Sequence, residues 1–215
     1  MKTFQLKGVP REIVGKKASK AVRRGNMIPA VLYGSEPVVL PYEGTLNTGE
    51  HVVDLGDGKG VVVTNFAVTQ DGIRGLIYTS EVFLVELSLE GGKKATAMIK
   101  DIQFHPVTDA ILHIDFLEIF EEKPIVIDIP VALEGYAEGV KSGGKLSLEM
   151  RKLKVKALYK QIPEKLTIDI TNLGLGKTIQ VGSLHFDQLE LVNAKNAVVC
   201  AVKLTRAARG AAASK

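Results

Sequence analysis

The sequence predicts a mainly β protein with few helices, arranged as two domains. Apolar residues occur in short runs rich in Val, Ile and Phe, and Gly, Pro and Asp separate these runs, as in strands joined by turns. The length of 215 residues, 46% of them hydrophobic, is enough for two buried cores. Three charges and a proline at residues 121–124 follow a long apolar run and indicate a boundary. We therefore expect domains at residues 1–120 and 121–204, followed by a disordered, basic and Ala-rich tail at 205–215.

The strands of the first domain are predicted where an apolar run is short and bounded by turn residues. They are expected at residues 3–6, 30–33, 82–89, 95–104 and 110–120. Gly91 and Gly92 between two of these runs predict a hairpin. The segment GDGKG at residues 56–60 is similar to a phosphate loop, but it lacks the Lys-Ser/Thr ending and a strand-like run follows it. We interpret it as a hairpin turn.

The second domain repeats the same pattern of short apolar runs. Its strands are expected at residues 125–131, 151–158, 166–170, 189–192 and 197–204, with one short helical turn at 183–188. Lys152, Lys154 and Lys156 alternate with apolar residues, which predicts a strand with one basic face. That face either contacts RNA or is solvated and protects a sheet edge, and the spacing favours the second interpretation.

Two helices are expected in the first domain. Lys16–Arg24 is the stronger candidate, because Gly25 follows it as a terminator. The second spans residues 69–78, where Thr69 is placed to cap the helix and apolar residues recur at helical spacing, although two glycines lower its propensity.

The first helix lies in a strongly basic segment. Residues 1–24 carry a net charge of +7, whereas residues 25–120 carry −8 and residues 121–215 carry +5. On a helical wheel the cations lie within about 120° of one another, and Ala18, Ala21 and Val22 lie opposite. These cations are Lys16, Lys17, Lys20, Arg23 and Arg24. Solvated faces usually mix charge signs, so this face favours binding to phosphates over simple solvation.

Several classes of protein are excluded by composition. Cys200 is the single cysteine, so neither an intrachain disulfide nor a thiolate metal cluster can form. No apolar run approaches the roughly 20 residues of a membrane span, and charges interrupt the first 15 residues where a secretion signal would need an apolar core. We expect a cytoplasmic protein with no cofactor and no membrane partner.

His105, His113 and Asp115 leave three interpretations open. His113 and Asp115 share one face of a strand, and His105 shares a face with Gln103 on the preceding strand. The two histidines would form an acid–base pair in an RNA-processing enzyme, whereas a metal site lacks a third ligand at convincing spacing. From spacing alone, a polar patch on the outer face of a sheet is favoured.

Motifs along the chain resemble one known family when taken in order. Arg11 is followed by GKKAS at residues 15–19, RRG at 23–25 and IPAVLYG at 28–34, then KDIQFHP at 100–106 and LHIDF at 112–116. Downstream, GVKSGGK at 139–145 and QIPEK at 161–165 complete the series. Together they resemble bacterial large-subunit ribosomal protein twenty-five in its long, two-domain form, also called the general stress protein CTC family.

The resemblance implies a fold and a function. It implies a six-stranded β-barrel with a few short helices, followed by a mostly β C-terminal domain. It also implies a non-enzymatic protein of the large ribosomal subunit that binds 5S ribosomal RNA and no small-molecule substrate. The alternatives are an RNA-binding stress module outside the ribosome, or an RNA-processing enzyme that uses His105 and His113.

The RNA-contacting residues are carried over by motif. The family's contacts match Arg11, Arg24, Tyr33, His113 and Asp115. The basic helix adds Lys16, Lys17, Ser19, Lys20 and Arg23, and the strand beside His113 adds Gln103 and His105. Residues 44–66 are longer and richer in glycine than the resemblance implies, which predicts an extra hairpin or loop.

Overall fold

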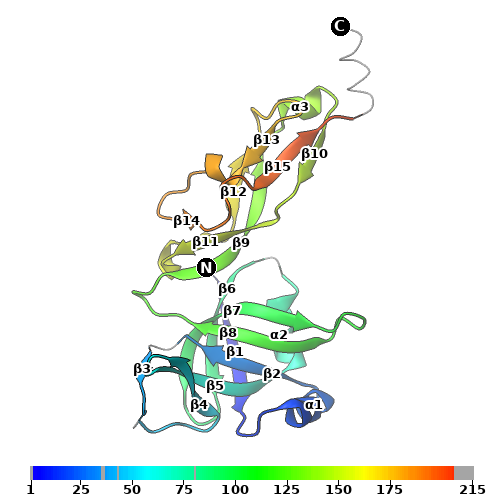
Figure 1. Ribbon diagram of the computed structural model, residues 1–215. Helices are drawn as coiled ribbons and strands as arrows, with labels where there is room; N and C mark the ends of the chain where they lie inside the picture. The colour runs from blue at the N-terminus through cyan, green and yellow to red at the C-terminus, as the bar shows by residue number, and fades with distance from the viewer. Residues whose placement is uncertain (1, 35–36, 43, 80, 206–215) are drawn as a thin grey trace. The chain divides into compact units, whose positions relative to one another are not determined.

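The chain divides into two compact units, Met1–Glu121 and Glu122–Lys215 (Figure 1). The computed structural model describes residues 2–34, 37–42, 44–79 and 81–205. Apart from Thr205, the tail predicted at 205–215 lies outside the described residues. No helix in the described ranges is long and apolar enough to cross a membrane.

Unit 1 is built on an eight-stranded sheet, six strands of which close into a barrel. The ring runs in the order β1-β6-β7-β8-β2-β5, and β5 pairs back with β1. This confirms the six-stranded barrel. The strands are β1 (Lys2–Pro10), β2 (Met27–Tyr33), β3 (Val38–Val39), β4 (Glu50–Gly56), β5 (Lys59–Thr69), β6 (Phe83–Leu89), β7 (Lys94–Phe104) and β8 (Ile111–Glu118).

Alternation along the strands fills the barrel and leaves polar side chains outside it. On β8, Ile114 and Phe116 are fully buried, whereas His113 and Asp115, which alternate with them, are partly exposed. The rings of Phe66 and Phe116 meet in the core with centroids 5.6 Å apart. β2 runs parallel to β8 and β7 runs antiparallel to it, so the outward residues of three strands form one continuous face.

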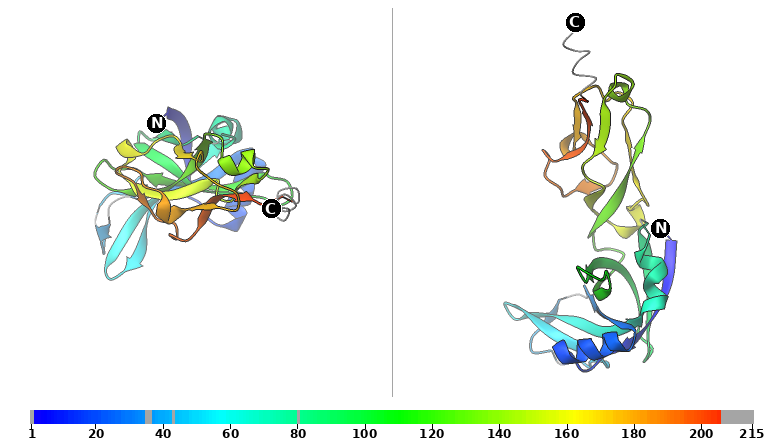
Figure 2. Two further views of the ribbon diagram at one scale, coloured as in Figure 1. Left: turned by 90° about the horizontal axis from the view of Figure 1, so that it is seen from above. Right: turned by 90° about the vertical axis from the view of Figure 1, so that its right-hand side faces the viewer.

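The two predicted helices of unit 1 are present and contact different parts of the barrel wall (Figure 2). α1 (Lys16–Arg24) has the predicted bounds and lies against β2. α2 (Gln70–Ile77) lies against β1 and β5, and its buried Ile73 and Leu76 join the core. The predicted cap is confirmed, because the Thr69 hydroxyl accepts from the backbone N–H of Gly72 at 3.3 Å.

The long segment at residues 44–66 forms the expected extra hairpin. β4 pairs antiparallel with the first half of β5, outside the barrel ring. Asp57 and Gly58 at the turn have φ values of 56° and 70°, the left-handed conformations of a tight hairpin turn. The glycine-rich segment is therefore a turn and not a phosphate loop.

Unit 2 contains two small sheets, with strand orders β12-β9-β11-β14 and β10-β15-β13. The predicted short helical turn at 183–188 is misplaced, because the helical turn ends at Ser183. The prediction also missed β10, β13 and α3, each of which has four residues or fewer. The elements are β9 (Ile125–Glu134), α3 (Glu138–Lys141), β10 (Lys145–Leu148), β11 (Lys152–Ala157), η1 (Tyr159–Gln161), β12 (Leu166–Asp169), β13 (Thr178–Gln180), η2 (Val181–Ser183), β14 (Glu190–Leu191) and β15 (Val198–Lys203).

Candidate nucleic-acid interface

The outer face of β8 carries a bonded pair of polar side chains. Nδ1 of His113 lies 2.7 Å from Oδ1 of Asp115, and the two side chains are 28% and 30% exposed. Gln103 of β7 is opposite His113 in the strand register, so it shares this face. The predicted shared face of His113 and Asp115 is therefore what the strand produces, and the strand register adds Gln103 to it.

Tyr33 lies at the edge of the same face, on β2. Burial raises the pKa of its hydroxyl above the ordinary value, and the negative charges of Asp115 and Asp101 raise the pKa further. Tyr33 is therefore a protonated hydroxyl at neutral pH that can donate a hydrogen bond.

Four of the five cations of α1 face solvent. Lys16, Lys17, Lys20 and Arg24 are exposed. Arg23 differs from the prediction of a fully outward cationic face, because it is half-buried and its Nη1 donates to the backbone oxygen of Leu112 at 3.1 Å.

The packed side of α1 is rotated relative to the predicted wheel. Ala18, Ser19 and Val22 are half-buried along with Arg23, whereas Ala21, predicted on the packed side, is exposed. The side chain of Arg23 is long enough for its guanidinium to reach the backbone of β8, which draws this edge of the helix inward. The exposed arc still carries only cations and Ala21.

Arg11 positions the start of the helix. Its Nη2 donates to the backbone oxygen of Ile13 at 3.3 Å and to the Ser19 hydroxyl at 3.4 Å. Burial lowers the pKa of the Arg11 guanidinium, and the nearby charge of Arg23 lowers it further. Arg11 and Arg23 thus lie close together. Since Leu112 precedes His113, the Arg23 end of the basic helix lies next to the strand that carries the His113–Asp115 pair.

His105 does not lie where the sequence placed it. It follows the last residue of β7 and does not share a strand face with Gln103. Its Nδ1 accepts from the backbone N–H groups of Val107 at 3.3 Å and Thr108 at 3.2 Å, so it holds the β7–β8 turn. Within the described ranges, no three His, Cys, Asp or Glu side chains are grouped to hold a metal ion.

Asp101 is a member of this face that the sequence analysis missed. It is opposite Asp115 in the register of β7 and β8 and influences Tyr33 electrostatically. Alternate residues of a strand lie on one side of the sheet. Because Asp101 is two residues before Gln103, the sequence could have placed it on the same face.

The lysines of the basic strand in unit 2, β11, lie beside carboxylates from the neighbouring strands. Leu153 and Val155 are fully buried, which confirms the alternation. Lys154 is opposite Asp128 in the sheet, and Nζ of Lys156 lies 3.3 Å from Glu190. This face is therefore partly neutralised, unlike the exposed side of α1.

Comparison with known proteins identifies the family. The model of the Ribosomal L25p family matches residues 6–48 and 55–116, and the model of the ribosomal protein TL5 C-terminal domain matches residues 124–206. Large ribosomal subunit protein bL25 of Porphyromonas gingivalis is 61% identical over 215 residues, covering 100% of both chains. The chain belongs to the bL25 family of large ribosomal subunit proteins.

Two further bL25 relatives match over nearly their whole length. The protein from Parabacteroides distasonis is 58% identical and covers 99% of each chain, and that from Bacteroides fragilis is 52% identical and covers 100% of this chain and 98% of its own. The resemblance stated from the motifs is confirmed. Because these relatives are named as ribosomal proteins, the expectation that the chain is not an enzyme is confirmed as well.

Proposed function

We propose that this bL25 protein is a structural component of the large ribosomal subunit that binds 5S ribosomal RNA through unit 1. The observation that carries the proposal is the bond from Arg23 to Leu112, because it joins the cationic helix to the strand of the His113–Asp115 pair. A surface with phosphate-binding cations beside groups for base edges and 2′-hydroxyls is suited to a structured RNA.

The parts of this surface act differently. Lys16, Lys17, Lys20 and Arg24 are exposed and neutralise phosphates, which supplies affinity without sequence information. Asp115 accepts from Nδ1–H of His113, which leaves the Nε2 atom of His113 for the RNA. The hydroxyl of Tyr33, which is close enough to Asp115 to feel its charge, is a second group for the RNA. The packed side of α1 is held by Arg11, Ser19 and Arg23, which also contact the RNA where the helix meets the barrel. Gln103 extends the polar face onto β7.

Titration with 5S ribosomal RNA tests the proposal. The full chain should bind 5S ribosomal RNA stoichiometrically and more tightly than an unrelated structured RNA, and it should leave the RNA intact. Equal affinity for both RNAs would contradict a specific site.

A second measurement separates a ribosomal component from an RNA-binding stress module outside the ribosome. As a ribosome-associated protein of the cytoplasm, the chain should sediment with large ribosomal subunits in a cell extract. Exclusive recovery in the ribosome-free fraction would favour the stress module.

A further inference from the structure

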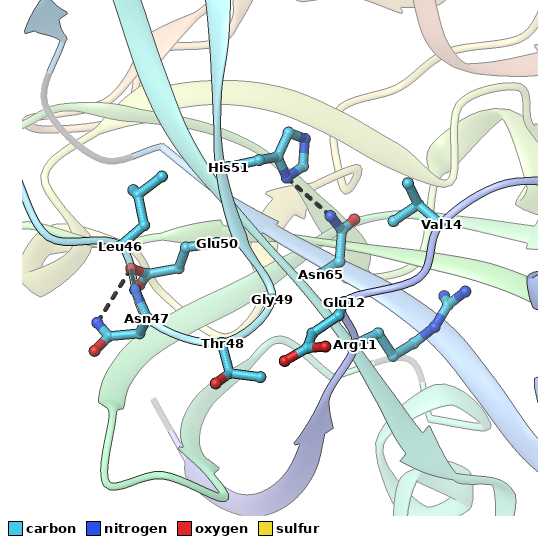
Figure 3. A pocket seen from close by; sticks show the side chains of 10 residues that line it. All are labelled: Arg11, Glu12, Val14, Leu46, Asn47, Thr48, Gly49, Glu50, His51 and Asn65. Atoms are coloured by element: carbon cyan, nitrogen blue, oxygen red, sulfur yellow. Dashed lines mark hydrogen bonds between the residues drawn. The ribbon is translucent and has the colours of Figure 1, made fainter.

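Unit 1 has a pocket of about 450 Å³ beside Arg11 (Figure 3). Its wall is formed by the segment before α1, the loop before β4, and β4 and β5 themselves. Backbone hydrogen bonds fix these segments. The N–H of Arg11 donates to the backbone oxygen of Asn65 at 2.9 Å, and the N–H of Asn65 donates to the backbone oxygen of Gly49 at 2.8 Å. Gly49 has φ +84°, and a Cβ there would lie 2.6 Å from the Asn65 carbonyl oxygen, so the close approach requires glycine.

His51 and Asn65 present a defined donor and acceptor to this pocket. Asn65 is 9% exposed, and its Nδ2 donates to Nδ1 of His51 at 2.9 Å. Because Nδ1 accepts, the neutral imidazole carries its proton on Nε2, which is then a donor. The amide oxygen of Asn65 accepts no hydrogen bond from the part of the chain that the structure describes, and it lies on the side of the amide away from His51.

The rest of the lining contains both charge signs, from Arg11 and Glu12, and two apolar side chains. Glu12 is exposed and adds a carboxylate, which repels a phosphate but accepts from N–H groups. Val14 and Leu46 are 58% and 40% exposed and supply apolar surface for the faces of a ring. The lining is mostly polar, so hydrogen-bonding groups and not apolar burial would select the ligand.

Guanine has the complementary edge. Its Watson–Crick edge has two adjacent donors, N1–H and the N2 amino group, beside the O6 acceptor. Glu12 and Asn65 can accept from the donors, and Nε2–H of His51 can donate to O6. Adenine, cytosine and uracil each present only one donor on that edge. Recognition of RNA commonly uses unstacked bases bound in this way.

Part of the pocket wall comes from a segment that the Ribosomal L25p family model does not match. Residues 49–54 lie between the two matched segments, and they include Gly49 and His51 of the pocket wall. The residues that the family model matches are therefore not enough to form the pocket.

We propose that this pocket binds an unstacked guanine of the RNA held by unit 1, an inference that rests on the proposed function. Arg11 connects the two sites, because its guanidinium bonds to Ser19 of α1 while Arg11 itself lines the pocket. The guanine is thus an additional base contact next to the basic helix.

The test uses the full chain and 5S ribosomal RNA from Porphyromonas gingivalis, the source of one relative. Guanines are probed with a glyoxal reagent that reacts at N1 and N2, at saturating protein. We expect the wild-type chain to protect a guanine that Glu12→Gln and His51→Ala leave reactive. Each variant should weaken binding about five- to twenty-fold, with an unchanged salt slope.

Asp57→Asn is the matched control, because it removes a carboxylate from the turn of the same hairpin outside the pocket. It should retain wild-type protection and affinity. Glu12→Gln tests the inference even if His51→Ala is unstable, because Glu12 is exposed.

Identical guanine reactivity with the wild-type chain and both variants would overturn the pocket inference and leave the proposed function intact. The same experiment repeated with dimethyl sulfate, which reacts at N1 of adenine and N3 of cytosine, tests the choice of base. A variant-dependent change at an adenine or cytosine alone would overturn the assignment to guanine. A wild-type chain that does not bind 5S ribosomal RNA would overturn both proposals.

Discussion

Nδ1 of His113 lies 2.7 Å from Oδ1 of Asp115 on the outer face of β8. A carboxylate is unexpected on a surface proposed to bind RNA, because it repels phosphate. Here it fixes the orientation of the imidazole and the nitrogen that carries the proton. The pair therefore separates specific recognition from charge attraction, and the two alternatives make opposite predictions for Asp115.

Replacing Asp115 should weaken binding to 5S ribosomal RNA although it removes a negative charge. We expect Asp115→Ala to cost about 1–3 kcal/mol of binding free energy, because His113 loses its partner and polar groups at the interface are left unpaired. Asp115→Asn should cost less, since its amide oxygen still accepts from Nδ1–H. The measurement is the affinity for 5S ribosomal RNA and for an unrelated structured RNA at two salt concentrations. Tighter binding of both RNAs by Asp115→Ala would show that Asp115 is only a surface charge.

Removing an exposed cation of α1 should reduce the salt dependence of RNA binding. Each lost phosphate contact should lower the slope of log affinity against log salt by roughly 0.7–0.9. Lys20→Ala is the cleanest test, because Lys20 is exposed, whereas Arg23 also bonds to Leu112. Lys7→Ala, which removes an exposed lysine from β1, is the control and should leave the slope unchanged. A folded Lys20→Ala variant with the wild-type slope would place this helix face in solvent.

A fragment of residues 1–121 should fold and keep most of the affinity for 5S ribosomal RNA. The closed barrel and all the proposed contacts belong to this unit. Circular dichroism would report folding and a binding titration the affinity. If the folded fragment binds ten-fold or more weakly than the full chain, β11 with Lys152 and Lys154 becomes a contact candidate.

Lys93 should stabilise unit 1 in a pH-dependent manner. Its Nζ donates to Glu50 at 2.5 Å and to the Thr64 hydroxyl at 2.9 Å, and the Glu50 side chain is only 6% exposed. Lys93→Met leaves this carboxylate nearly buried without its cation. We expect it to lower the free energy of unfolding by about 2–4 kcal/mol at pH 7.

The effect of Lys93→Met should shrink in acid. Burial alone would raise the pKa of Glu50, but hydrogen bonds from Lys93 and Asn47 outweigh it and hold the pKa below its usual value. The stabilisation from the charged carboxylate is therefore present above the unfolded pKa and is lost as pH falls through the folded pKa. Urea unfolding at pH 7 and at about pH 4 should show this convergence. Lys94→Met, at the exposed neighbouring position, should show little loss at either pH.

Features set by neighbouring residues were predictable. The bounds of α1 follow from a run of helix-compatible residues closed by Gly25, and the cap of α2 follows from Thr69. The shared face of His113 and Asp115 follows from the period of a strand. His105 shows where this reasoning fails. Its ring accepts two hydrogen bonds from backbone N–H groups in the turn after β7, and strand alternation does not predict these bonds.

The sequence by itself determined the β pattern, the order of the family motifs and the concentration of cations in Lys16–Arg24, because these depend on local composition and backbone geometry. Only the tertiary structure decided that Arg23 bonds to Leu112, 89 residues away, and that His51 and Asn65 meet in a pocket. Such contacts depend on strand register and on how the barrel closes, which many distant residues set together. A local pattern therefore cannot specify them.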